Sequence, residues 1–173
     1  VTFAASLSPW QEMNSLFVLD GSHAGTPERA TWKYLVDSIP VDGRIIHPDE
    51  TSPFLTAMAA ELERRETERD SDAPPILMLV YHLARFRDLR RAEDEFSLGG
   101  FGTSDKPRQP GQIFADLLAR GPAVGMHAMI WCDSYNNVDR WISRQSMREL
   151  EIRIACQMNG SDSSNLIGSP AAS

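Results

Sequence analysis

One uninterrupted apolar run, Ile76 to Tyr81, limits the folds open to this chain more than any other feature. It is short and follows Pro74-Pro75, so it has the length and the boundary of a strand rather than those of a helix. A strand that is apolar at every position must be covered on both faces. We therefore expect this run at the centre of a mainly parallel sheet.

Short apolar runs and amphipathic segments alternate along the rest of the chain, which is typical of strands alternating with helices. The pattern predicts an α/β fold with three layers, in which a mainly parallel sheet carries helices on both faces. The 173 residues suit one such domain. The predicted strands are 16–19, 44–47, 76–81, 126–131 and 153–158. The predicted helices are 27–38, 52–69, 83–95, 113–120 and 138–150. We expect a flexible loop at 97–112 and a polar tail after residue 158.

The charge balance and the cysteines narrow the class of protein. With 24 acidic and 17 basic side chains the formal net charge is -7, whereas an autonomous nucleic-acid-binding module is normally basic. Two cysteines cannot build a disulfide framework, which favours a reducing, cytoplasmic location. The sequence contains no run near the roughly 18 apolar residues of a membrane span, so we expect no membrane contact from this segment.

Polar residues at the predicted strand ends are the candidate site residues. Parallel sheets bind ligands beyond the carboxyl ends of their strands, marked here by Asp20, by Tyr81-His82 and by Cys132-Asp133. A phosphate-binding G-x-x-x-x-G-K-[ST] motif does not occur in the sequence.

Two other chemistries are disfavoured by spacing. Cys132 and His127 lie five positions apart on one predicted strand, which places them on opposite faces and argues against a cysteine hydrolase. The four histidines lack metal-ligand spacing, so we expect no structural metal.

Several segments, in order, resemble the motor domain of the FtsK/SpoIIIE-type DNA translocase family, whose members are RecA-like P-loop ATPases that assemble as hexameric rings. The segment 75–86 resembles the strand that carries the family's Walker B motif and the turn after it. The stretches 114–121, 124–127 and 130–133 are similar to the family's next helix, Gly-x-His turn and sensor strand. The last similar stretch, 153–163, corresponds to the final strand and its Asp-Ser turn.

The sequence departs from this family where the chemistry is concentrated. Tyr81 and His82 stand where the resemblance places the Walker B Asp-Glu pair, and Cys132-Asp133 stands at the sensor position. A neutral tyrosine cannot help to hold Mg²⁺ as a carboxylate does. The resemblance also places the Walker A segment upstream of residue 1.

The resemblance implies a partial RecA-like P-loop NTPase core from a larger motor protein, with ATP and Mg²⁺ as cofactors of the parent family. We expect this chain alone to be inactive, to bind neither tightly, and to serve as a structural or regulatory lobe. Its expected partners are other motor lobes or a homo-oligomeric ring, and DNA through the parent. The alternative is an active translocase of DNA or protein whose Walker A lies upstream and whose Mg²⁺ is held by Asp20 or Asp133. Asp20 and Arg153 are the candidate cofactor-binding residues.

Overall fold

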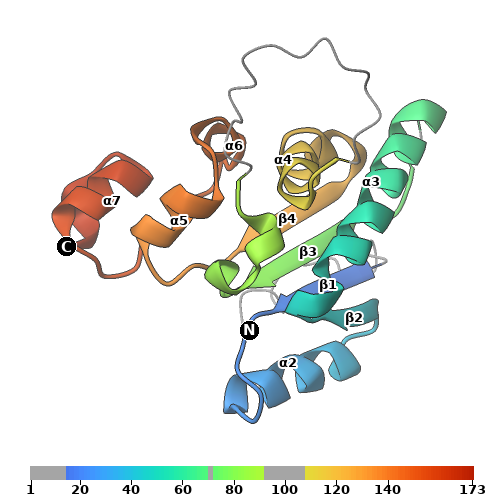
Figure 1. The fold of residues 1–173 in the computed structure, drawn as a ribbon, viewed down its shortest axis with the longest axis horizontal. Coiled ribbons are helices and arrows are strands. Elements are labelled where there is room, and N and C mark those ends of the chain that lie inside the picture. Colours follow the sequence, from blue (N-terminus) through green and yellow to red (C-terminus); the bar gives the residue numbers. More distant parts are fainter. Residues whose placement is uncertain (1–14, 70–71, 92–107) are drawn as a thin grey trace.

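Four parallel strands form the sheet of the computed structural model, which describes residues 15–69, 72–91 and 108–173. The strands are β1 (Ser15–Asp20), β2 (Asp42–Ile46), β3 (Ile76–Tyr81) and β4 (Met126–Ile130). Their order is β2-β1-β3-β4, so β1 and β3 are the inner strands (Figure 1). The chain leaves β1 for one neighbour and returns past it to form β3 on the other side. The direction of winding therefore changes between β1 and β3, where α/β sheets commonly bind ligands.

The central position of β3 is confirmed. Leu79 pairs in register with Val18 of β1 and with Met129 of β4. The exposed fractions of β3 side chains from Ile76 to Val80 are between 0% and 7%. Burial on both faces explains why this strand is apolar at every position.

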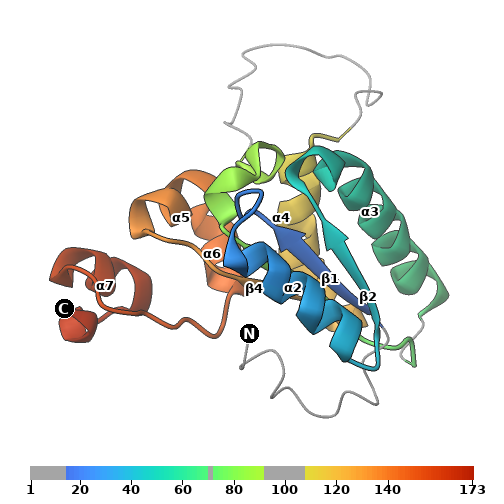
Figure 2. The same ribbon diagram turned by 90° about the horizontal axis from the view of Figure 1, so that it is seen from below.

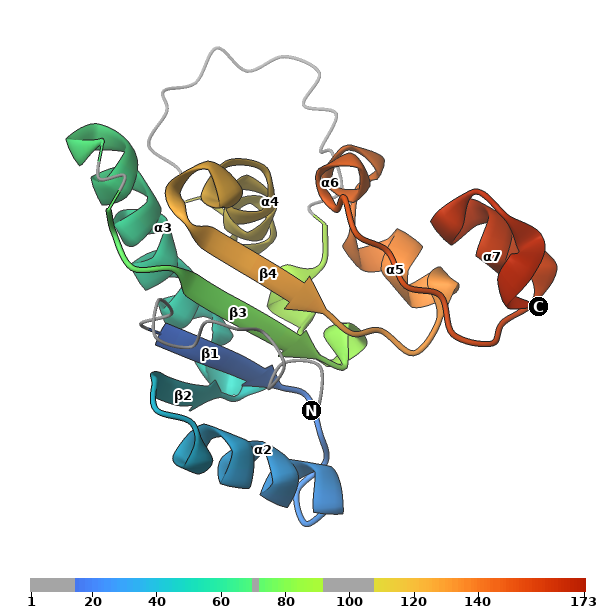
Figure 3. The same ribbon diagram turned by 180° about the vertical axis from the view of Figure 1, so that it is seen from behind.

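Helices cover both faces of the sheet, as the alternation of elements predicts. On one face α2 (Pro27–Ser38) packs Trp32 and Leu35 against inner-strand residues that include Leu79. The other face carries α3 (Thr51–Glu68) and α4 (Pro110–Arg120), which enclose the larger core (Figures 1 and 3). Figure 2 shows the same arrangement from the side of α2. The fold is thus a three-layer α/β fold.

The predicted helix at 83–95 is wrong in its described part. Residues after β3 form two 3₁₀ turns, Leu83–Arg85 and Arg87–Leu89, and residues from 92 onward lie outside the described ranges. Leu83, Phe86 and Leu89 recur every third residue and all are fully buried. A spacing of three matches the three residues per turn of a 3₁₀ helix, which explains why this apolar pattern does not produce a long α-helix.

The region after β4 also differs from its prediction. The expected helix at 138–150 is divided into α5 (Tyr135–Trp141) and α6 (Arg144–Glu149), because the Ser143 side chain accepts the backbone N–H of Ser146 and starts a second helix. The tail contains a helix, α7 (Gly160–Ile167), which begins at the capping residue Asn159. The expected loop at 97–112 lies outside the described residues up to 107, and its last part is helical, since α4 begins at Pro110.

The expected strand at 153–158 is not formed. In the described part of the chain, this segment pairs with no strand of the sheet. Ile152 and Ile154 are 85% and 68% exposed. A strand is stabilised by its neighbours, so an alternating apolar pattern without a neighbour remains irregular.

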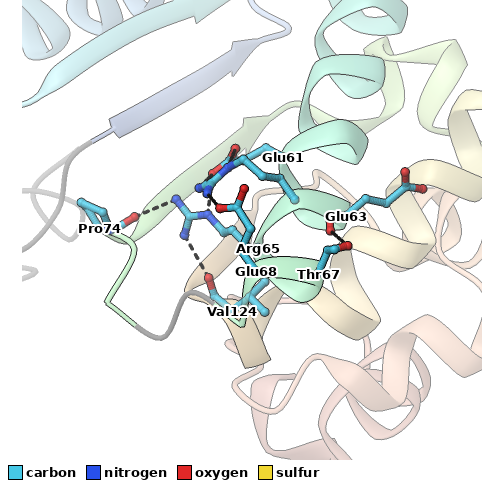
Figure 4. A network of polar contacts seen from close by, with 8 residues as sticks. Glu61, Glu63, Arg65, Thr67, Glu68, Pro74 and Val124 are labelled. Carbon is cyan, nitrogen blue, oxygen red and sulfur yellow. Dashed lines mark hydrogen bonds and ion pairs between the residues drawn. The ribbon is translucent and has the colours of Figure 1, made fainter.

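A buried arginine ties α3 to the edge of the sheet where β3 and β4 begin. Arg65 is 3% exposed. Its guanidinium donates to the carbonyl oxygens of Pro74 and Val124, each at 2.9 Å, and to Oε1 of Glu61 at 2.7 Å (Figure 4). Pro74 precedes β3 and Val124 precedes β4, so one side chain holds the entry points of both strands.

Candidate functional site

The carboxyl ends of β1, β3 and β4 meet at one edge of the sheet and bring several predicted site residues together. Asp20 at the end of β1 lies in register with Tyr81 at the end of β3. The chain continues β4 through Trp131, whose backbone N–H donates to the Val80 carbonyl at 2.8 Å. Cys132 and Asp133 follow directly. The strand-end rule therefore selects residues from three different strands that share one edge.

Asp20 has a buried carboxyl group, one oxygen of which accepts a hydrogen bond while the other has no partner among the described residues. It is 1% exposed, and its Oδ1 accepts the backbone N–H of Ser22 at 2.9 Å. Neither Asp20 Oδ2 nor the Ser22 hydroxyl has a hydrogen-bond partner among the described residues. A buried polar atom normally has a partner, so these two oxygens are available to a hydrogen-bonding group or a cation.

The turn after Asp20 lies in close contact with the end of β3. Gly21 donates its backbone N–H to the Tyr81 carbonyl at 3.0 Å. A Cβ atom at this glycine would lie 2.6 Å from the same carbonyl oxygen, closer than real Cβ atoms approach. The approach of the two backbones therefore requires glycine here and places Asp20 beside β3.

Tyr81 is the centre of an aromatic cluster. Its ring stacks on Trp131, with centroids 4.9 Å apart, and meets Trp32 of α2 edge-on at 5.2 Å. His82 meets both Tyr81 and Trp131 at 4.4 Å. Burial, followed by the carboxylates of Glu28 and Asp20, raises the pKa of the Tyr81 hydroxyl, which therefore stays neutral over the physiological range.

His82 is packed and uncharged at neutral pH. Burial lowers the pKa of its imidazole, and Arg85 and His23 act in the same direction against Asp133 and Asp20. The backbone of His82 is left-handed, with φ 60° and ψ 63°, which turns the chain sharply from β3 into the first 3₁₀ turn. Both residues at the carboxyl end of β3 are thus neutral members of an aromatic cluster.

Cys132 and Asp133 have local structural roles. Burial raises the pKa of the Cys132 thiol, which disfavours the nucleophilic thiolate. Cys132 packs with the core on the side of α3, while Met129, at the same strand parity as His127, packs on the side of α2. Asp133 accepts a hydrogen bond from the Asn137 side chain at 2.8 Å, and this bond lowers the pKa of its carboxyl group.

The other predicted residues do not join the strand-end cluster. Arg153 donates to the backbone carbonyls of Leu150 and Leu166, both at 3.1 Å, so its described partners belong to the C-terminal segment. Of the remaining histidines, His23 is hydrogen-bonded to Arg85 and His47 to Arg29. In the ranges that the structure describes, no three His, Cys, Asp or Glu residues are grouped so that they could hold a metal ion.

A cavity of about 470 Å³ opens between α2 and the ends of β3 and β4. Its walls include Glu28, Thr31 and Trp32 from α2 together with Leu79, Tyr81 and Trp131. Sequence patterns did not single out Trp131, Trp32 or Glu28. A signal was present for Trp131 alone, since an aromatic residue directly after a strand lies at the same edge as the polar residues already selected.

Comparisons with known proteins add no further constraint. No family model matches this chain, nor does any curated protein or solved structure. In the described helices, none is long and apolar enough to cross a membrane.

Proposed function

We propose that this chain is part of a RecA-like motor lobe of an FtsK/SpoIIIE-like P-loop ATPase, and that its own nucleotide chemistry is degenerate. In this proposal the lobe builds or regulates a larger motor, in contact with other motor lobes or with copies of itself in a ring. DNA would be contacted through the parent assembly, in the cytoplasm. The net charge of -7 favours a role as a lobe over direct DNA binding.

The observation that carries the proposal is the neutral aromatic end of the central strand. An ATPase of this kind needs acidic groups there, one to help hold Mg²⁺ and one to activate water. The resemblance aligns Tyr81 and His82 with those acidic groups, and both rings are packed against Trp131. Both are neutral at physiological pH, so Mg²⁺ finds no carboxylate at either residue. Loss of a general base typically costs about 10² to 10⁴ in rate.

Asp20 favours the alternative of an active ATPase. Its unpartnered Oδ2 and the Ser22 hydroxyl lie beside the end of β3. Mg²⁺ is commonly bound through one or two carboxylates, with waters and phosphates completing its ligands. Asp20 and Ser22 are therefore the residues that would hold the ion in this alternative, where it would neutralise phosphate charge. Asp133 is less suited, because Asn137 already occupies one of its oxygens.

Calorimetry with Mg-ATP tests the degenerate reading. The degenerate reading expects no binding tighter than about 10 μM, which corresponds to about 7 kcal/mol. Tighter binding that Asp20→Asn abolishes would overturn it and favour the alternative in which Asp20 holds Mg²⁺. Asp37→Asn is the matched control, because Asp37 is an exposed carboxylate on α2 whose partner is Lys33.

A further inference from the structure

The cavity beside α2 has walls with the chemistry of a cation site. Three aromatic side chains, Trp32, Tyr81 and Trp131, line it. The rings support one another, since Tyr81 contacts Trp131 at 4.9 Å and Trp32 at 5.2 Å between centroids. Aromatic rings attract cations through their quadrupoles, and a cage of several rings suits methylated ammonium groups, which are poorly hydrated.

The one charged group in the cavity wall is a carboxylate. Its own backbone N–H, followed by the Thr26 side chain, lowers the pKa of the Glu28 carboxyl group, so Glu28 is ionised at neutral pH. No lysine or arginine lines the cavity among the described residues. The start of α2 contributes roughly half a positive charge, which is smaller than the full charge of the carboxylate. The balance therefore favours a cation over an anion.

The cavity is large enough and accessible. A volume of about 470 Å³ lies within the range of roughly 300 to 1,000 Å³ that is usual for small-molecule sites. Trp131 is 42% exposed at its mouth, although the buried Trp32, at 5%, forms a rigid wall. Among the residues that the structure describes, nothing covers this aromatic surface beside the carboxylate, and such a surface suits a ligand that is apolar in shape and positive in charge.

From these observations we infer that the cavity between α2 and the carboxyl ends of β3 and β4 binds a quaternary ammonium group. The group could belong to a free small molecule such as choline or to a trimethylated lysine side chain. The inference does not depend on the proposed nucleotide chemistry, because it uses none of the residues that would hold Mg²⁺.

The decisive test compares choline with 3,3-dimethyl-1-butanol, which has the same shape without the charge. Binding is followed by calorimetry and by quenching of tryptophan fluorescence. Choline is expected to bind with a Kd on the order of 1 mM, and the neutral analogue about tenfold more weakly.

A peptide with trimethyl-lysine, compared with its unmodified form, distinguishes a protein source of the ammonium group from a free small molecule. Equal binding of the two small molecules, or binding of neither choline nor the trimethylated peptide at 10 times the expected Kd, would overturn the inference.

Two variants locate the site. Trp131→Leu removes one exposed ring and is expected to weaken binding about tenfold. Glu28→Gln keeps the shape and removes the charge, for an expected loss of about fivefold that shrinks at high salt. The matched controls are on α2: Tyr34→Leu, since Tyr34 is 75% exposed and does not line the cavity, and Asp37→Asn. Circular dichroism checks the fold of each variant. Unchanged affinity in both cavity variants would refute this location.

Discussion

Replacing Arg65 by methionine tests how this fold holds together. The side chain of Arg65 is 4% exposed and makes three hydrogen bonds that join α3 to the entry points of β3 and β4. Methionine keeps much of the apolar stem and removes the guanidinium. The substitution therefore leaves the carbonyl oxygens of Pro74 and Val124 without this donor in a buried place.

The expected loss follows from the number and type of bonds. A hydrogen bond from a charged donor contributes about 1.5 to 3 kcal/mol, and breaking a buried ion pair costs about 3 to 5 kcal/mol. The lower part of that range applies, because Glu61 keeps a second partner in Arg64, at 2.8 Å from its Oε2. We expect the free energy of unfolding to fall by about 3 kcal/mol, which lowers Tm by about 10 °C for a domain of this size.

The neighbouring arginine provides the control. Arg64 is on the same helix and also pairs with Glu61, but its side chain is 41% exposed. Exposed ion pairs contribute about 0 to 1 kcal/mol, so Arg64→Met should lower Tm by less than about 3 °C. Thermal and urea unfolding, followed by circular dichroism, measure both variants. Equal losses in the two variants, or a loss below about 1 kcal/mol for Arg65→Met, would refute the argument that the buried carbonyl contacts hold the sheet entry.

Two further predictions concern burial and acid. Leu79→Asp should unfold the domain, because Leu79 is 4% exposed and a carboxylate at this position would have no partner. The control His127→Asp, at an exposed position of β4, should have the same melting temperature as the wild type. A folded Leu79→Asp protein would show that position 79 does not belong to the core. The Glu61 carboxyl has its pKa lowered to about 2, chiefly by the Arg64 side chain, so its contribution is complete above its ordinary pKa of 4.5 and is lost as pH falls toward 2. After allowance for solvent screening, the loss in the free energy of unfolding is about 1 to 2 kcal/mol. In urea titrations between pH 6 and 2, the wild type should lose about 1 to 2 kcal/mol more than Glu61→Gln. Parallel pH profiles of the two proteins would contradict the prediction.

The sheet could be predicted from the sequence because burial leaves a local record. All four described strands were predicted, the additional strand expected at 153–158 is not formed, and the central place of β3 followed from its composition alone. The helix α3 was predicted for the same reason, since its apolar residues Phe54, Leu55, Met58 and Leu62 recur at helical spacing and are buried. Such patterns depend on which side chains face the core, and neighbouring residues share that environment.

The errors arise where structure depends on distant partners. Arg91 donates its backbone N–H to the Trp141 carbonyl, and the Trp141 indole donates to the Phe86 carbonyl at 2.8 Å, so the turns after β3 are held by α5. The sequence of residues 83–91 does not predict these contacts with α5. The strand prediction at 153–158 is wrong because a strand also needs a neighbour. The alternating residues of this segment suit a strand, but no strand of the described chain pairs with it.

The candidate site, too, could be predicted only where local patterns determine it. The rule that parallel strands end at one edge predicts that Asp20, Tyr81 and Asp133 lie near each other, and it needs only the strand boundaries. It cannot tell which face each side chain occupies or how far a helix extends over that face. The aromatic cavity depends on both: Tyr81 and Trp131 share the face that carries α2, and α2 brings Trp32 and Glu28 to them from another part of the chain. Tyr81 therefore belongs both to the polar strand-end set that the sequence rule selects and to the aromatic wall of the cavity next to Glu28, and only the structure shows the second role.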